Sequence, residues 1–328
     1  MQRTLVTAAC LALASGTASS AQPRTTNVQA ESGPTLVDKA TQTEDVQFKN
    51  DGAKRMTVPV LLSGQGPYRF LVDTGANRTA ISREVASRLK FVAGEAASLH
   101  DAAGVSNVST ATVPTLQLTK KEIRNVEAAL LESANMGADG ILGTDSLRAQ
   151  RVLFDFEAQT LSIVPSAAPD FRVEPGTIVV QGARKNGRLI VTDASANGRS
   201  LTVVVDTGAQ YSIGNAALRK SLLGAKLLGP SQPIQLETVT GEKIAGEFMF
   251  VRQLEIGGVT LKNLLIVFAD AHTFKLLGFD RKPALLLGMN AMRAFKKVSI
   301  DFSTRKLRVV VPEHSSLDLR LAAAKLTP

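Results

Sequence analysis

The chain has 328 residues, enough for two domains of roughly 100–150 residues each. Hydrophobic residues make up 44% of it, so a sizeable core can be buried, whereas aromatic residues make up 5% and Trp is absent. Few aromatic side chains argue against base stacking on single-stranded nucleic acid. The formal charge of +9 is scattered along the sequence, which indicates a basic soluble surface and no nucleic-acid partner.

The N-terminal residues 1–21, MQRTLVTAACLALASGTASSA, contain one Arg, a short apolar stretch and then small residues. This layout predicts a secretory signal peptide cleaved after Ser20 or Ala21, and therefore a periplasmic or extracellular protein. The apolar stretch is too short to cross a bilayer core of about 30 Å as a helix, and no membrane span is expected. Cys10 is the only cysteine and would leave with the signal peptide, although a lipoprotein with a lipid on Cys10 is an alternative.

Residues 22–54 are polar and lack periodicity, so they are expected to form a flexible segment. From residue 55, short β-branched runs broken by Gly and Pro predict strands, the first two joined by a turn at 64–67. We expect a first module over 55–166 and a second over 167–313, joined near a Pro- and Gly-containing stretch at 165–176. Residues 314–328 would form a short amphipathic helix or tail.

The two predicted modules repeat the same order of features. In the first, a strand leads into DTGA at 73–76, followed by a short helical stretch, a Gly-containing turn, an apolar segment and a final hairpin. The second follows the same order from DTGA at 206–209. The equivalent pairs are Asp73 and Asp206, Gly104 and Gly241, Gly143 and Gly288, and Asp155 and Asp301. The chain is therefore predicted to be a tandem duplication of a mostly-β module.

A single Asp-Thr-Gly after a strand is an ordinary turn sequence, but two copies at equivalent positions point to a shared site. If the modules face each other about a pseudo-twofold axis, Asp73 and Asp206 become adjacent carboxylates that share one proton. The ionised member can take a proton from water as it attacks a carbonyl, while the protonated member donates to the carbonyl oxygen. The neighbours expected to fix this geometry are Thr74, Gly75, Thr207 and Gly208.

The sequence resembles the retropepsin-type aspartic proteases, in particular the bacterial secreted relatives of the retroviral enzymes. The resemblance rests on VDTGA at 72–76 and 205–209, and on ILG at 141–143 and LLG at 286–288. It implies an all-β fold with a few short helices, in which two tandem retropepsin-like β-barrel modules form a pseudo-twofold pair. By position it implies catalytic Asp73 and Asp206, flap tips at Gly104 and Gly241, and supporting turns formed by Ile141, Leu142, Gly143, Leu286, Leu287 and Gly288.

Some residues depart from the family pattern or fall outside it. The retroviral enzymes commonly have Arg after the second-motif Gly, where this chain has Thr144-Asp145 and Met289-Asn290. Asp139 and Asp145 are expected at solvated loop positions. The three histidines, His100, His272 and His314, show no metal-binding spacing, so surface or packing roles, no metal and no cofactor are expected.

The leading hypothesis is an aspartic endopeptidase that hydrolyses peptide bonds in peptides or unfolded proteins. The alternative is a non-catalytic peptide-binding or scaffold protein that retains the fold. A monomer with an intramolecular pseudo-dimer is favoured over a homodimer in which each module pairs with another chain.

Overall fold

The computed structural model describes residues 6–8, 12–13, 45–47, 49–50, 56–118, 121–147, 149–168 and 174–312. Most of the predicted signal peptide, most of the segment 22–54 and the predicted C-terminal helix at 314–328 lie outside the described residues. Within the N-terminal part, four short strands are described: β1 (Val6–Ala8), β2 (Ala12–Leu13), β3 (Asp45–Gln47) and β4 (Lys49–Asn50). None of the described helices has the length and apolar character needed to cross a bilayer.

The first half of the chain forms a closed six-stranded barrel in the order β5-β6-β13-β7-β12-β11, and β11 closes the ring by pairing with β5 at Leu116 and Leu62. The barrel strands are β5 (Met56–Leu62), β6 (Gln65–Val72), β7 (Ala80–Ser82), β11 (Thr110–Leu118), β12 (Lys121–Leu131) and β13 (Gly140–Leu142). The other elements are β8 (Val92–Ala93), β9 (Ala97–His100), β10 (Val105–Val108), α1 (Arg83–Arg88), α2 (Ser133–Met136) and α3 (Thr144–Leu147).

The second half repeats this strand order as β18-β21-β26-β22-β25-β24, with β19 pairing along β24. Its strands are β17 (Ala183–Lys185), β18 (Arg188–Val191), β19 (Ala194–Ala196), β20 (Arg199–Ser200), β21 (Thr202–Val205), β22 (Ser212–Gly214), β23 (Gln232–Thr238), β24 (Lys243–Ile256), β25 (Val259–Ala269) and β26 (Ala284–Leu287). Its helices are α4 (Ala216–Gly224), α5 (His272–Leu276) and α6 (Met289–Met292). The predicted mostly-β tandem fold is confirmed.

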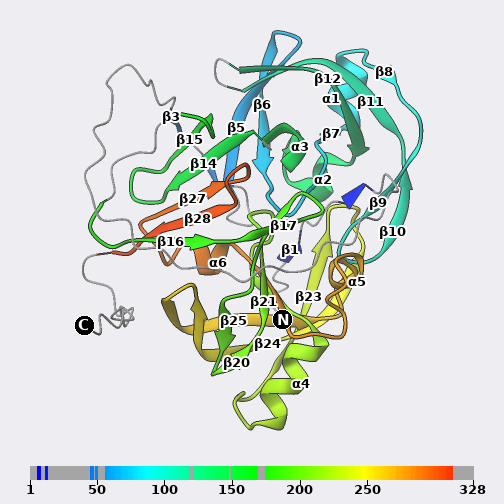
Figure 1. Ribbon diagram of the computed structural model, residues 1–328. Coiled ribbons are helices and arrows are strands. Elements are labelled where there is room, and N and C mark those ends of the chain that lie inside the picture. Colours follow the sequence, from blue (N-terminus) through cyan, green and yellow to red (C-terminus); the bar gives the residue numbers. More distant parts are fainter. Residues whose placement is uncertain are drawn as a thin grey trace.

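A six-stranded sheet joins the two halves in the order β16-β28-β27-β14-β15-β3. Its strands are β14 (Gln150–Asp155) and β15 (Thr160–Pro165) from the first final hairpin, β27 (Lys297–Asp301) and β28 (Lys306–Val310) from the second, and β16 (Thr177–Gln181). The hairpins pair antiparallel through β14 and β27, with Val152 opposite Ile300. Figure 1 shows this sheet beside the two halves, with the first half above the second.

Local sequence explains how the repeated elements begin and turn. Helices α1 and α4 start at the equivalent caps Ser82 and Asn215, whose side chains accept backbone N–H groups of the first turn. The turn between β5 and β6 lies at Ser63 and Gly64, whose φ angles of 48° and 75° are left-handed. The turn predicted at 64–67 was therefore misplaced, because two consecutive left-handed residues form the tight hairpin that suits twisted strands.

Candidate active site

Both DTG turns follow the buried end of a strand that has a parallel neighbour. Strand β6 ends in Phe70–Val72 and β21 ends in Val203–Val205, all of them buried. Beside them run β13 and β26, which pair Leu142 with Val72 and Leu287 with Val205. The Asp73 N–H donates to the Leu142 carbonyl and the Asp206 N–H to the Leu287 carbonyl, each at 3.1 Å. The same construction therefore places each aspartate at the end of two buried parallel strands.

The glycine that ends each apolar-apolar-Gly element is required by a close backbone crossing. A Cβ added at Gly143 would lie 2.4 Å from the carbonyl carbon of Arg78, and one at Gly288 would lie 2.5 Å from that of Tyr211. Real Cβ atoms do not approach backbone so closely. Glycine therefore lets the chain after β13 and β26 pass directly beside the DTG turns.

Reciprocal hydrogen bonds between Thr74 and Thr207 join the two turns. The Thr74 hydroxyl donates to the Val205 carbonyl at 3.0 Å and the Thr207 hydroxyl to the Val72 carbonyl at 2.6 Å. Each hydroxyl oxygen also accepts the other threonine's N–H, at 3.0 and 3.1 Å. All four bonds are buried, and losing one partner would leave a buried polar group unsatisfied. They connect residues more than a hundred positions apart within one chain.

The two aspartate side chains meet across this junction, each lying against the glycine of the opposite turn. A Cβ added at Gly75 would be 2.3 Å from Asp206 Oδ1, and one added at Gly208 would be 2.3 Å from Asp73 Oδ2. Only a residue without a side chain leaves room for the opposite carboxyl. The structure therefore brings Asp73 and Asp206 of the same chain together.

Burial and mutual repulsion govern the protonation of this pair. Both aspartates are 0% exposed. Asp73 Oδ1 accepts the N–H groups of Gly75 and Ala76 at 2.8 and 2.9 Å, and Asp206 Oδ1 accepts the Gly208 N–H at 3.0 Å. These bonds favour the ionised forms, but burial, followed by the charge of Asp206, raises the pKa of Asp73 well above its usual range. The pair therefore holds a proton under conditions in which an exposed aspartate would be ionised.

A second layer of hydrogen bonds holds the strand that follows each turn. Asp145 accepts the Thr79 N–H at 3.0 Å and the Thr79 hydroxyl at 2.8 Å. Asn290 accepts the Ser212 N–H at 2.8 Å and the Ser212 hydroxyl at 2.9 Å. The solvated position expected for Asp145 was therefore wrong, because its carboxylate is half-buried against these donors. Thr79 and Ser212 each stand six residues after their aspartate, a repeated spacing that would have revealed them.

The other predicted acidic neighbour, Asp139, lies beside the start of the first supporting strand. Its carboxylate accepts the Arg69 N–H at 2.8 Å in an exposed setting. It therefore contributes to a strand connection rather than to the buried pair.

The candidate flap residues Gly104 and Gly241 lie in turns at the ends of two hairpins whose tips meet. Gly104 lies between β9 and β10, and Gly241, with a left-handed φ of 86°, lies between β23 and β24. The Thr240 hydroxyl donates to Asp101 Oδ2 at 2.5 Å across the tips. Each tip also inserts a small apolar side chain into the core of the opposite half, Ala102 into the second and Val239 into the first.

Two histidines that are distant in sequence come together at this contact. His100 Nδ1 and His272 Nε2 lie 3.0 Å apart, with their rings stacked at 5.3 Å between centroids. The backbone N–H of His272 also donates to the Ala102 carbonyl at 2.8 Å. Both side chains thus pack between the first hairpin and the second half, as expected for packing roles, whereas His314 lies outside the described residues.

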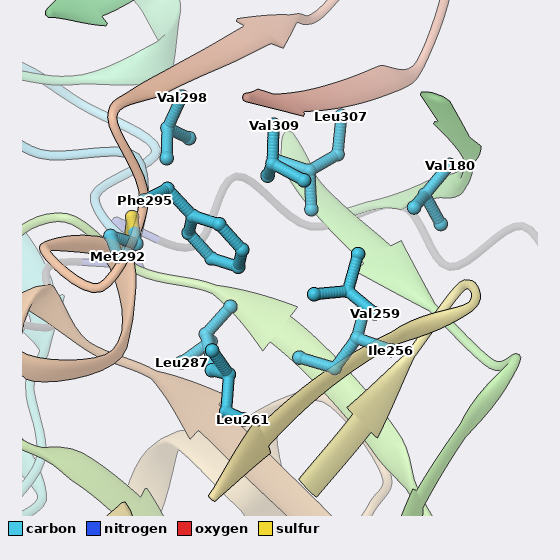
Figure 2. A pocket seen from close by; sticks show the side chains of 10 residues that line it. All are labelled: Val180, Ile256, Val259, Leu261, Leu287, Met292, Phe295, Val298, Leu307 and Val309. Carbon is cyan, nitrogen blue, oxygen red and sulfur yellow. The ribbon is translucent and has the colours of Figure 1, made fainter. Parts of the chain in front are cut away.

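An apolar cavity in the second half is separate from the aspartate pair. It lies between the β24–β25 hairpin, α6 and the joining sheet (Figure 2), and ten side chains line it: Val180, Ile256, Val259, Leu261, Leu287, Met292, Phe295, Val298, Leu307 and Val309. Its volume of about 10 Å³ is barely that of one water, and an apolar cavity of this size is a packing defect rather than a ligand site. Across the described residues, no group of three or more His, Cys, Asp or Glu side chains could hold a metal ion.

Comparison with known families supports the same duplication. Residues 58–149 match the family described as gag-polyprotein putative aspartyl protease, and residues 192–291 match the family described as aspartyl protease. Each match includes one DTG turn and its apolar-apolar-Gly element, and together the two matches cover more than half of the chain. No curated protein matches the chain. The chain is therefore a tandem pair of aspartyl protease domains of the retropepsin-like family.

Proposed function

We propose that this protein is an aspartic endopeptidase in which Asp73 and Asp206 form the catalytic pair. The observation that carries the proposal is the buried meeting of the two carboxyls, held by the reciprocal Thr74–Thr207 bonds. A turn that served only its own half would not need a glycine shaped to accept the other half's carboxyl. The arrangement fits a site that keeps one proton between two carboxyls.

The chemistry follows from that shared proton. The ionised carboxylate accepts a proton from water as the water oxygen attacks the peptide carbonyl carbon, and the protonated carboxyl donates its proton to the carbonyl oxygen. Collapse of the tetrahedral intermediate breaks the C–N bond as the carboxyl that took the proton from water donates it to the leaving amine nitrogen. Asp73 Oδ2 is buried and accepts no hydrogen bond from the described residues, which suits an oxygen that holds the shared proton or binds the water.

The hairpins support a peptide as the substrate class. Strand β23 pairs in parallel with Val6–Ala8, and β9 pairs antiparallel with Ala12–Leu13. Two short strands of this chain thus form backbone ladders, one with each hairpin. Edges that pair with an extended strand bind peptides mainly through main-chain hydrogen bonds, which tolerate varied side chains.

The test is cleavage of a peptide library and of an unfolded protein across acidic to neutral pH. We expect wild-type cleavage that a pepstatin-like inhibitor blocks, and a loss of at least about 10²-fold in kcat/KM for Asp73→Asn and for Asp206→Asn. Asp139→Asn is the matched control and should retain activity, because that carboxylate is outside the pair. Wild-type activity in either pair variant would refute the proposal, and peptide binding without cleavage at any pH would favour the non-catalytic alternative.

We also propose that the protein acts as a monomer and is exported. The pair is assembled within one chain, so no second copy is needed to complete it, and light scattering should give the monomer mass. Export would remove residues 1–20 or 1–21, so N-terminal sequencing of the mature protein from the periplasmic or extracellular fraction should begin at Ala21 or Gln22. A cytoplasmic protein that retains Met1 would refute the export proposal.

A further inference from the structure

Arg188 is a buried cation beside the aspartate pair that the proposed chemistry leaves unexplained. It is the largest of the fully buried side chains, at 0% exposed. Taking a guanidinium out of water is costly unless opposite charge and hydrogen-bond acceptors surround it. We therefore expect hydrogen-bond acceptors or carboxylates close to the Arg188 guanidinium.

The strand register places Arg188 next to the second DTG turn. Strand β18 pairs antiparallel with β21, Ile190 opposite Val204 and Val191 opposite Val203. Continued by two residues, the same register sets Arg188 opposite Asp206. Arg188 precedes Asp206 by 18 residues, and Arg55, which lies outside the described residues, precedes Asp73 by the same number. This repeated spacing is a sequence signal for the position.

The side chain of Arg188 reaches the turn of the other half. Its Nε donates to the Gly75 carbonyl at 2.5 Å in a buried setting. The N–H of Gly75 binds Asp73 Oδ1, and its Cα faces the Asp206 carboxyl. One peptide segment thus touches both aspartates, and Arg188 holds that segment from the second half.

We propose that Arg188 is a positioning residue for the aspartate pair: it fixes the Gly75 segment between the two carboxyls, and its charge favours the form of the pair with one ionised carboxylate. This role rests on the proposed function, because it concerns the same site.

The charges around the pair agree with this role. Burial, followed by Asp206, raises the pKa of Asp73; the Gly75 and Ala76 N–H groups and, to a smaller extent, Arg188 lower it. Burial, then His272 and to a smaller extent Arg188, lower the pKa of His100. The cation therefore acts on the pair and on the first hairpin.

Two substitutions separate the charge from the hydrogen bond. Arg188→Gln removes the charge and keeps an N–H donor of similar reach, whereas Arg188→Lys keeps the charge and loses the planar fork. Arg308→Gln is the matched control, because Arg308 is also buried but lies on β28 in the joining sheet. Circular dichroism and thermal unfolding would establish that each variant is folded.

The readout is the titration of the two aspartates, followed by NMR with carboxyl-¹³C-labelled Asp and assigned with Asp73→Asn and Asp206→Asn. In Arg188→Gln the first apparent pKa of the pair should rise by about one pH unit, and the acid limb of kcat/KM should move with it. Arg188→Lys and Arg308→Gln should titrate like the wild type.

Each outcome decides a separate point. A wild-type titration in folded Arg188→Gln, or a raised one in Arg188→Lys, would overturn the proposed role, even if activity fell. If Arg188→Gln does not fold, the titration of Arg188→Lys still tests the proposed role: a wild-type titration supports it and a raised pKa overturns it. A wild-type protein that cleaves no peptide would refute the proposed function, while the titration would still decide whether Arg188 sets the charge of the pair.

Discussion

Replacing Gly75 or Gly208 with Ala tests the geometry of the aspartate pair most directly. At Gly75 the new methyl carbon would lie 2.3 Å from Asp206 Oδ1 and 2.5 Å from its Cγ. Ordinary contact begins at 3.4 Å, so the turn and the carboxyl must separate by about 1 Å, a misplacement that can cost about 10²-fold in rate. Neither glycine has a left-handed φ, so the effect is steric and not a matter of backbone conformation.

We expect Gly75→Ala and Gly208→Ala each to lower kcat/KM by at least about 10²-fold, equivalent to about 2.7 kcal/mol of transition-state stabilisation. Overpacking of this kind should also lower the free energy of unfolding by about 1–3 kcal/mol. Peptide cleavage assays and denaturant unfolding measure the two effects.

The matched control is Gly229→Ala, because a Cβ at Gly229 would meet nothing within 4 Å. This variant should keep both activity and stability. Wild-type kcat/KM in Gly75→Ala or Gly208→Ala would show that the opposite carboxyl does not lie against that glycine, and the reasoning about the pair would be refuted.

Three further predictions concern stability. Thr207→Val should lower the free energy of unfolding by about 2–4 kcal/mol, because it leaves the buried Thr74 N–H and the buried Val72 carbonyl without this hydrogen-bond partner. Thr207→Ser should restore most of the loss in denaturant titrations. The raised pKa of Asp73 means that the folded state binds this proton more tightly than the unfolded state does. The free energy of unfolding therefore falls as pH rises from the pKa of Asp73 in the unfolded chain towards its pKa in the folded protein. Asp73→Asn should therefore unfold at a higher temperature than wild type at neutral pH, and a gap that stays constant on acidification would contradict this linkage. Burial, then His272 and Arg188, lower the pKa of His100, so stability should fall as pH drops below about 6.5; hydrogen exchange of β9 and β10 should speed up on acidification in wild type and less so in His100→Gln.

Local features of the sequence were enough to predict the duplicated β fold. The spacing of apolar runs, the two DTGA turns, and the paired Gly143 and Gly288 depend on short-range backbone preferences and on packing of adjacent strands. Such features repeat wherever the module repeats, so the second copy strengthened the prediction made from the first. The turn after β5 was misplaced, since Gly66 and Pro67 are stronger turn formers than the Ser63 and Gly64 that make it.

Sequence patterns alone predicted that each half carries Asp-Thr-Gly after an apolar strand, followed by a matching apolar-apolar-Gly element. The three-dimensional structure was needed to show that Asp73 meets Asp206 of its own chain, that Arg188 reaches Gly75, and that His100 stacks on His272. Those contacts join residues more than a hundred positions apart, and they form only when the two barrels dock. No local propensity encodes that docking; it depends on apolar burial and buried hydrogen bonds between the halves.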